Sequence, residues 1–291
     1  MIEFPAEKYD LAATLASGQA FRWRGVGGAW EGVVAGRWVG LRQNRNTIHA
    51  ETAAPPPDWV WLRHYLQLDV NIDNVCATFP DDEPMRRSVQ SCSGLRLLRQ
   101  DPWECLASFI CSSTKQIVQI QQIIALLCRN FGEPLPVPPG RGPVHSFPHF
   151  SRLAALTESD LRACKLGFRA PYLLGAARKL AAGEIDLEAL PSATLEEARE
   201  QLMELPGVGL KIADCVLLFA YGFPDAFPVD VWVMRALRQL YFPKRRVKLP
   251  RLRHFSRTYF GPHSGYAQQY LFHYMRTKSR KNGLLTRAGK S

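Results

Sequence analysis

The sequence lacks the cysteine pairs that zinc knuckles, iron–sulfur loops and disulfide frameworks use. Its seven cysteines form an odd set without one Cys-X-X-Cys pair, which argues against those three kinds of site. No run approaches the ~20 consecutive apolar residues that span a bilayer, and the first residues lack the basic and apolar regions of a signal peptide. We therefore expect no cofactor, no catalytic metal, no membrane association and no secretion signal.

The chain is also short of negative charge. Among its 291 residues, 37 Lys and Arg outnumber 26 Asp and Glu, which gives a formal net charge of +11. A surplus of this size favours a polyanionic partner, either nucleic acid or an anionic membrane surface. Hydrophobic residues make up 46% of the chain, which is ordinary for a globular protein and sufficient for a substantial core.

The spacing of apolar residues changes along the chain from a strand pattern to a helix pattern. Short runs rich in aromatic and β-branched residues, separated by glycine turns, predict strands within residues 20–50. Beyond residue 100 the spacing predicts helices at 103–112, 117–131, 158–164, 171–182, 194–204, 210–221, 231–240 and 264–276. Residues 134–148 are typical of a surface loop, and the basic residues from 278 onward of a frayed tail. The sequence thus predicts an α+β fold, with an N-terminal antiparallel β-sheet lobe (1–92) packed on a mainly α-helical domain (93–291).

The sharpest local signal is the segment Leu-Pro-Gly-Val-Gly-Leu-Lys-Ile-Ala-Asp at 205–214, between two predicted helices. Gly207 and Gly209 flank the apolar Val208, so backbone N–H groups can approach an anion without obstruction by a Cβ atom. The next helix begins there, with unpaired N–H groups and the positive end of its dipole at the same point. The segment is either a phosphate cradle or an ordinary turn between two helices.

Three side chains near this segment could carry chemistry. Lys211 lies in the first turn of the helix, where the dipole disfavours a cation, and a Schiff-base nucleophile must be a neutral amine. A surface lysine that touches a phosphate is the simpler interpretation. Asp230 is a good N-cap for the following helix and also a candidate carboxylate partner for Lys211. Cys215 lies on the same helical face as Lys211 and on its own would be a core cysteine.

Motifs spread along nearly the whole chain resemble those of the helix-hairpin-helix DNA glycosylases, and in particular the 8-oxoguanine DNA glycosylases. Besides the hairpin, they are Ser-Gly-Gln-Ala-Phe-Arg-Trp at 17–23, Tyr-Leu-Gln-Leu-Asp-Val at 65–70, Leu-Leu-Arg-Gln-Asp-Pro at 97–102, Ser-Phe-Ile-Cys-Ser-Ser at 108–113, Leu-Gly-Phe-Arg-Ala at 166–170, Pro-Val-Asp at 228–230, and Gly-Tyr-Ala-Gln at 265–268 with Phe272. The resemblance implies a base-excision-repair enzyme that is both N-glycosylase and abasic-site lyase. Its partner would be double-stranded DNA containing oxidised guanine.

The resemblance also implies a role for each matching residue of the pocket. Lys211 would attack C1′ of the damaged nucleoside to form a Schiff base that proceeds to β-elimination, and Asp230 would stabilise positive charge on the sugar. The base would be flipped out of the duplex into a pocket formed by four residues. Cys215 and Phe272 would sandwich the base, Gln268 would bond its Watson–Crick edge, and the Gly18 carbonyl would accept the N7–H that guanine lacks.

The implied DNA contacts include several departures from the family pattern. The residues implied to contact DNA are four in the hairpin segment, Gly207, Val208, Gly209 and Ile212, and five elsewhere, Trp232, Thr114, Gln119, Phe168 and Arg169. Thr114 and Gln119 stand where the family has residues that contact the orphaned cytosine. The wedge aromatic is Phe168 rather than Tyr, and Trp232 replaces a phosphate-contacting His. We therefore expect weak discrimination among the bases opposite the lesion.

Two other functions remain open. A non-catalytic helix-hairpin-helix protein that binds damaged DNA would keep the hairpin, although phosphate binding needs neither Lys211 nor Asp230. An alkyl-purine DNA glycosylase would use the Asp without a lysine nucleophile, which Lys211 and Gln268 argue against. We expect a monomer, located in the cytoplasm or nucleoid of a bacterium or in the nucleus of a eukaryote.

Overall fold

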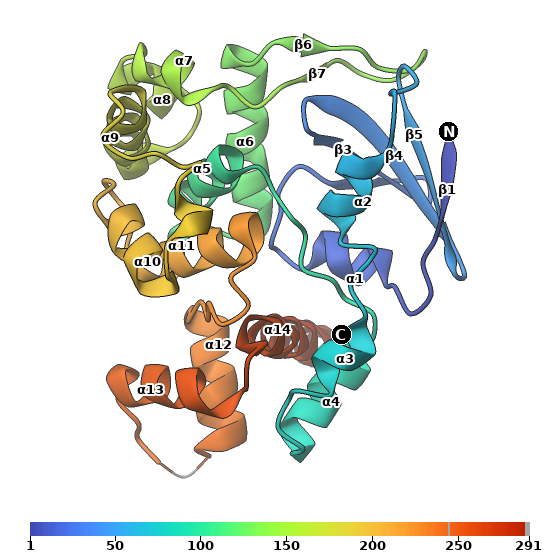
Figure 1. The fold of residues 1–291 in the computed structure, drawn as a ribbon, viewed down its shortest axis with the longest axis vertical. Helices are drawn as coiled ribbons and strands as arrows, with labels where there is room; N and C mark the ends of the chain where they lie inside the picture. The colour runs from blue at the N-terminus through green and yellow to red at the C-terminus, as the bar shows by residue number, and fades with distance from the viewer. Residues whose placement is uncertain (244, 289–291) are drawn as a thin grey trace.

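The computed structural model describes residues 1–243 and 245–288, in which a sheet lobe packs beside a body of helices (Figure 1). Five antiparallel strands form the sheet in the order β1-β5-β4-β3-β2. Their bounds are β1 (Ile2–Pro5), β2 (Arg24–Val26), β3 (Ala29–Val34), β4 (Arg37–Asn44) and β5 (Thr47–Thr52). The α+β class and the N-terminal antiparallel sheet are confirmed, while the division of the chain at residue 92 stays a prediction.

Helices make up most of the remaining chain. In order they are α1 (Leu11–Ala16), α2 (Val60–Leu66), α3 (Ile72–Cys76), α4 (Glu83–Ser91), α5 (Pro102–Ser112), α6 (Ile117–Phe131), α7 (Phe150–Ala154), α8 (Glu158–Ala163), α9 (Ala170–Ala181), α10 (Leu195–Met203), α11 (Leu210–Val216), α12 (Val231–Ala236), α13 (Leu249–Tyr259) and α14 (Ser264–Ala288). The short 3-10 turns are η1 (Gly167–Arg169) and η2 (Leu190–Ser192). Helices α11 and α12 continue into π-helical turns, η3 (Leu217–Tyr221) and η4 (Leu237–Tyr241).

Local sequence signals set several of these boundaries. The Asp101 side chain accepts a 2.7 Å hydrogen bond from the Glu104 N–H at the start of α5, and Pro102 occupies the first helical position. Helix α6 begins with a capping box and stops at Gly132, as its apolar stripe predicts. The helix predicted at 210–221 ends at Gly222, whose φ of 79° is left-handed.

Several segments differ from the sequence expectation, among them β1, which lies outside the predicted strand region. Helix α13 was not expected; Lys248 gives it no side-chain cap, although a proline stands in its first turn. The segment 134–148 is not wholly a loop, since β6 (Pro134–Leu135) pairs with β7 (Val144–His145). The last helix does not fray at 278 but continues to Ala288, and residues 289–291 lie outside the described part of the chain.

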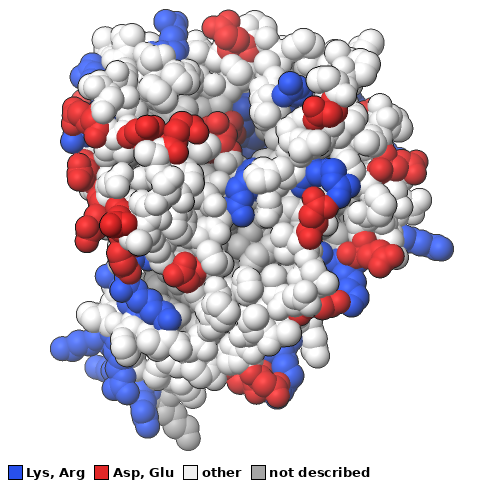
Figure 2. Space-filling model, viewed as in Figure 1, with Lys and Arg blue, Asp and Glu red and all other residues white. Residues whose placement is uncertain are grey.

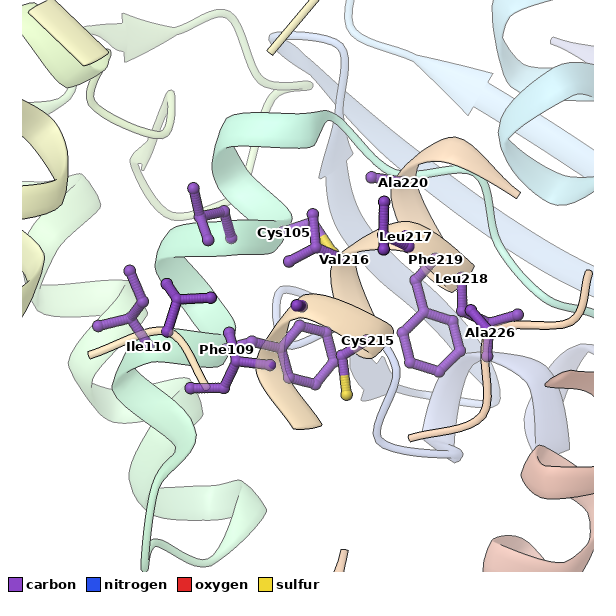
Figure 3. Packing of buried hydrophobic residues seen from close by; sticks show 14 of the residues in the cluster. Cys105, Phe109, Ile110, Cys215, Val216, Leu217, Leu218, Phe219, Ala220 and Ala226 are labelled. Atoms are coloured by element: carbon purple, nitrogen blue, oxygen red, sulfur yellow. The ribbon is translucent and has the colours of Figure 1, made fainter. Parts of the chain in front are cut away.

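Two apolar cores hold the elements together. One lies where the sheet packs on α1 and α2, and the larger one runs through α5, α9, α11 and η3. In the larger core, the ring of Phe109 on α5 stacks on that of Phe219 on η3 at 5.7 Å, close to Cys215 of α11 (Figure 3). Helix α14 runs between α12 and α4 and contacts both (Figure 1). Among the described residues, no helix has the length and apolar character needed to cross a membrane.

A buried glutamine joins the sheet lobe to the helical body. The Gln19 Nε2 atom donates to the Arg96 carbonyl at 2.8 Å, to the Thr14 carbonyl at 3.0 Å and to Ser17 Oγ at 3.0 Å. Its Oε1 atom accepts from the Leu98 N–H at 2.8 Å. Because Gln19 is fully buried, these bonds fix the conformation of the loop that carries Gly18.

We predict that Gln19→Met destabilises the fold, because Met has a similar size but cannot replace these hydrogen bonds. Each buried partner left unsatisfied costs about 1–3 kcal/mol, so urea unfolding should show a loss of at least about 2 kcal/mol. The matched control Gln201→Met, on the exposed face of α10, should change the free energy of unfolding by less than about 0.5 kcal/mol. Equal stability of the two variants would contradict the role of Gln19 at this junction.

Candidate active site

Lys211 is the second residue of α11 and faces α5. Its Nζ atom lies 3.5 Å from Ser112 Oγ and 4.8 Å from the centre of the Phe109 ring. The side chain is half-buried. Helix α11 is only seven residues long before it widens into η3, and π-helical turns occur frequently at functional sites. The amine is therefore held against a rigid helix rather than extended into solvent.

The hairpin is a tight turn between α10 and α11, as its glycines predict. Gly207 has a φ of 79°, and a Cβ atom there would lie 2.7 Å from the Tyr172 side chain. Val208 is buried in the larger core, which anchors the turn. Gly209 is exposed, with open space where its Cβ would be. The first N–H groups of α11 have no partner within the helix, so they can receive an anion.

A buried ion pair braces the hairpin from behind. The Arg199 Nε atom of α10 donates to Asp214 Oδ1 of α11 at 2.7 Å, and Arg199 also pairs with Glu196. Burial raises the pKa of the Asp214 carboxyl, while the neighbouring Arg199 charge opposes this rise. Because breaking a buried pair leaves an uncompensated charge, the pair fixes α10 relative to α11.

Asp230 is the N-cap of α12, as expected. Its Oδ1 atom accepts hydrogen bonds from the Trp232 N–H at 2.9 Å and the Val233 N–H at 2.8 Å. Burial raises the pKa of the Asp230 carboxyl, while these N–H groups and the charges of Lys211 and Arg276 oppose the rise. The carboxylate is thus electrostatically coupled to Lys211. The Trp232 ring lies under the Arg235 guanidinium at 4.8 Å.

Gly18 and Phe272 come together from opposite ends of the sequence. Gly18 has a φ of 85°, and a Cβ atom there would lie 2.8 Å from Arg276 Nη1 and 3.6 Å from the Phe272 ring. Arg276 Nη1 donates to the Ser17 carbonyl at 3.2 Å, and its other terminal nitrogen donates to the Ala16 carbonyl. A side chain at position 18 would therefore fill the space between the sheet lobe and α14.

Cys215 and Gln268 are both 3% exposed. Burial raises the pKa of the Cys215 thiol to about 12, against the opposing charge of Lys211, so the thiol is neutral. The Gln268 Oε1 atom is buried without a hydrogen-bond partner among the described residues. An unsatisfied buried amide is costly in a protein interior, and this oxygen is available to accept a hydrogen bond.

The residues expected on either side of a flipped base form a second group. The Arg169 guanidinium, only 2% exposed, donates to Thr114 Oγ1 at 2.6 Å and to the Ser113 carbonyl. It also stacks on the Phe168 ring at 4.1 Å, and that ring is 56% exposed. Gln119 is exposed, and its Oε1 atom accepts from the Gln116 N–H at 3.0 Å.

The structure adds residues that the sequence patterns did not single out. Arg276 donates to the Ser17 and Ala16 carbonyls beside Gly18, and its charge opposes the rise in the pKa of Asp230; its position four residues after Phe272 on α14 was the available signal. Phe109 and Ser112 border Lys211. Both lie in the motif at 108–113, which the sequence analysis used only as part of the resemblance to the family. Among the residues that the structure describes, no group of three or more His, Cys, Asp or Glu is placed to hold a metal ion.

Comparisons with known proteins agree over nearly the whole chain. Residues 1–106 match the N-terminal domain of 8-oxoguanine DNA glycosylase, and residues 107–257 match the HhH-GPD superfamily base excision DNA repair protein family. A probable N-glycosylase/DNA lyase of Methanothermobacter thermautotrophicus is 31% identical, with 98% of each chain covered. The N-glycosylase/DNA lyase of Arabidopsis thaliana is also 31% identical, over 90% of this chain and 76% of that one.

A solved structure shows the same arrangement. The 8-oxoguanine glycosylase/lyase of Clostridium acetobutylicum, in complex with double-stranded DNA containing cytosine opposite 8-oxoguanine, is 32% identical with a TM-score of 0.89. The match covers 94% of this chain and 93% of that chain. The chain therefore belongs to the 8-oxoguanine DNA glycosylase/lyase family, bifunctional enzymes of the helix-hairpin-helix superfamily of base-excision DNA repair proteins.

Proposed function

We propose that this protein excises 8-oxoguanine from duplex DNA through attack by Lys211 and then nicks the abasic strand by β-elimination. The observation that carries the proposal is the position of the Lys211 amine. It lies at the start of α11, next to the hairpin, whose Gly207 and Gly209 are exposed, and its charge acts on the half-buried Asp230. Binding of a phosphate and attack on the adjacent sugar can therefore occur on one rigid unit.

The proposed reaction has two stages. The Lys211 nitrogen bonds to C1′ as the bond from C1′ to N9 breaks, and the base leaves with that electron pair and takes up a proton. Opening of the sugar ring gives a Schiff base between the lysine and C1′. Loss of a proton from C2′ then expels the 3′ phosphate, which nicks the strand. Asp230 stabilises the positive charge that develops on the sugar before the new bond is complete.

The base pocket lies between the sheet lobe and α14. The neutral Cys215 thiol and the Phe272 ring would lie on the two faces of the flipped base. The buried, unpartnered Gln268 Oε1 atom fits a hydrogen-bond acceptor for the Watson–Crick edge. The Gly18 carbonyl would accept the N7–H of 8-oxoguanine, and a mismatched buried acceptor costs about 1–3 kcal/mol against guanine.

The remaining contacts would hold the DNA. The hairpin amides at Gly207 to Gly209, with Val208 and Ile212 anchoring them, would bind a phosphate without reading sequence. The exposed Phe168 ring would fill the space left by the flipped base. The indole N–H of Trp232 would donate a hydrogen bond to a second phosphate. A monomer suffices, because every residue of the proposed site comes from one chain.

We predict that Lys211→Gln abolishes alkali-independent nicking of duplexes that contain 8-oxoguanine, because the variant has no amine to form the Schiff base. Strand cleavage should fall by at least about 10³-fold, as expected when a nucleophile is removed. The matched control Lys165→Gln removes an exposed lysine and should nick at the wild-type rate. Tight binding of wild-type protein to the damaged duplex, without nicking in the presence or absence of alkali, would instead support a non-catalytic damage-binding protein.

We predict that Asp230→Asn slows excision by about 10²–10³-fold but makes the fold more stable at pH 7. Burial holds the pKa of Asp230 above its unfolded value, so its ionised form costs stability at neutral pH, whereas Asn is neutral and still caps α12. The advantage of Asn should shrink as the pH falls through the raised pKa, where Asp230 itself becomes protonated. Thermal unfolding from pH 4 to pH 8 measures this, and a destabilised variant at pH 7 would refute it.

We predict weak dependence of excision on the base opposite the lesion. Arg169 donates through Nη2 to Thr114 and the Ser113 carbonyl and through Nη1 to the Leu166 carbonyl, and the residue is only 2% exposed, so it braces the Phe168 wedge rather than reaching the orphaned base. Each absent bidentate contact removes about 1–3 kcal/mol of discrimination, so single-turnover rates opposite the four bases should agree within about tenfold. A preference for cytosine of about 100-fold or more would show that Arg169 leaves its partners when DNA binds.

A further inference from the structure

The excess of positive over negative charge in this protein lies in its C-terminal part. Residues 231–291 hold 15 of the 37 Lys and Arg and none of the 26 Asp and Glu. Residues 1–230 hold the other 22 cations and all 26 acidic residues, which is a formal charge of −4. Any polyanion attracted by the net charge of +11 is therefore drawn to the elements that begin with α12.

Six of these cations form a surface that we call the basic ridge. It runs from α12 through η4 and the following loop to the start of α13, and its members, all exposed, are Arg235, Arg238, Arg245, Arg246, Lys248 and Arg251. Figure 2 shows Lys and Arg gathered at the lower left, over α13 and the loop before it. Acidic residues are grouped above them along the same edge.

The basic ridge is not neutralised within the protein. In the part of the chain that the structure describes, none of its six cations has a carboxylate within ion-pair distance. By contrast, Arg257 on α13 lies 3.7 Å from Glu196 of α10. A row of exposed like charges without counter-charges is unfavourable in the free protein, and an anionic ligand would relieve that repulsion.

The basic ridge is continuous with the proposed lesion site. It starts one turn after Trp232, and Arg253 of α13, two residues beyond its last member, lines a small cleft together with Leu210 and Lys211 of α11. Helix α12 and η4 together span 11 residues, which is roughly 16 Å at 1.5 Å per residue. At 3.4 Å per base pair along one strand, that length matches about five base pairs of flanking duplex.

An acidic surface on α10 limits where the DNA can lie. Glu196 of α10 is paired with Arg199 and with Arg257 of α13, whereas Glu197 and Glu200 of α10 and Glu204 at its C-cap are exposed. These carboxylates repel a phosphate backbone, whereas the basic ridge attracts one. A duplex held at the hairpin is therefore steered along α12 and away from α10.

We propose that the basic ridge is a second DNA-binding surface, which holds undamaged duplex on one side of the lesion through its phosphates. The proposal rests on the proposed function for the position of the lesion at the hairpin. It adds a contact that needs neither a damaged base nor a particular sequence, because Lys and Arg on phosphates read neither. Such a contact would keep the enzyme on DNA between lesions.

The first test is the salt dependence of binding to an undamaged 30-base-pair duplex. The variant Arg245→Gln/Arg246→Gln/Lys248→Gln should make the negative slope of log K against log salt shallower by about 2–3 units, because each phosphate that the protein neutralises contributes about −0.9 to that slope. The matched control Arg42→Gln/Arg45→Gln/Arg152→Gln removes the same charge from exposed sites elsewhere and should keep the wild-type slope. Equal changes in both variants would overturn the proposal, because net charge alone would then explain binding.

The second test is the direction of the flank. Two duplexes carry a stable abasic-site analogue near one end or near the other, so that the long flank lies on only one side of it. Wild-type protein should bind one of them about tenfold more tightly, as expected for about 1.4 kcal/mol of flank contact, and the ridge variant should bind both equally. Wild-type binding that ignores the direction of the flank would overturn the proposal.

These binding measurements do not depend on excision. If Lys211→Gln nicks DNA like the wild type, the proposed chemistry fails while the ridge can still be measured on undamaged duplex. If the ridge variant instead loses binding to anionic phospholipid vesicles and keeps its full affinity for DNA, the surface serves a membrane and the proposal is overturned. Thermal unfolding of both triple variants checks that their folds are intact.

Discussion

The site depends on the packing of α11 against α5. Phe109 and Ser112 of α5 border the Lys211 amine, Val208 fixes the hairpin in the core, and the buried pair of Arg199 and Asp214 locks α10 to α11. The amine and the hairpin amides therefore cannot move independently. In the proposed chemistry this rigidity matters because a nucleophile displaced by even about 1 Å loses much of its advantage over solvent.

The sheet lobe contributes residues to the proposed site. Gln19 joins the lobe to the segment before α5, and the adjacent Gly18 approaches α14 and α6 so closely that a Cβ atom would meet Arg276 of α14 and Ile117 of α6. Arg276 in turn contributes to the electrostatics of Asp230. The proposed pocket thus combines residues from both ends of the sequence, which explains why the resemblance to the family extends over the whole chain.

Much of this fold could be predicted from the sequence, because caps, glycine stops and apolar spacing act locally. Asp101, Gly132 and Gly222 set helix ends as expected, and the hairpin glycines form the expected turn. What escaped prediction depends on tertiary contacts. Helix α13 has no side-chain cap at its start. The hydrogen bond from Arg169 to Thr114 forms only when two distant loops meet, and Arg276 reaches the Ser17 carbonyl only when α14 packs on the lobe.

Identification of the residue that becomes covalently attached to DNA tests the proposed attack by Lys211 most directly. Wild-type protein would be incubated with a duplex containing 8-oxoguanine in the presence of borohydride, which reduces a Schiff base to a stable amine. Digestion and mass spectrometry would then locate the modified residue. If Lys211 forms the Schiff base, we expect a single DNA-linked peptide that carries the modification on Lys211. Attachment through another lysine or through the N-terminal amine would contradict it.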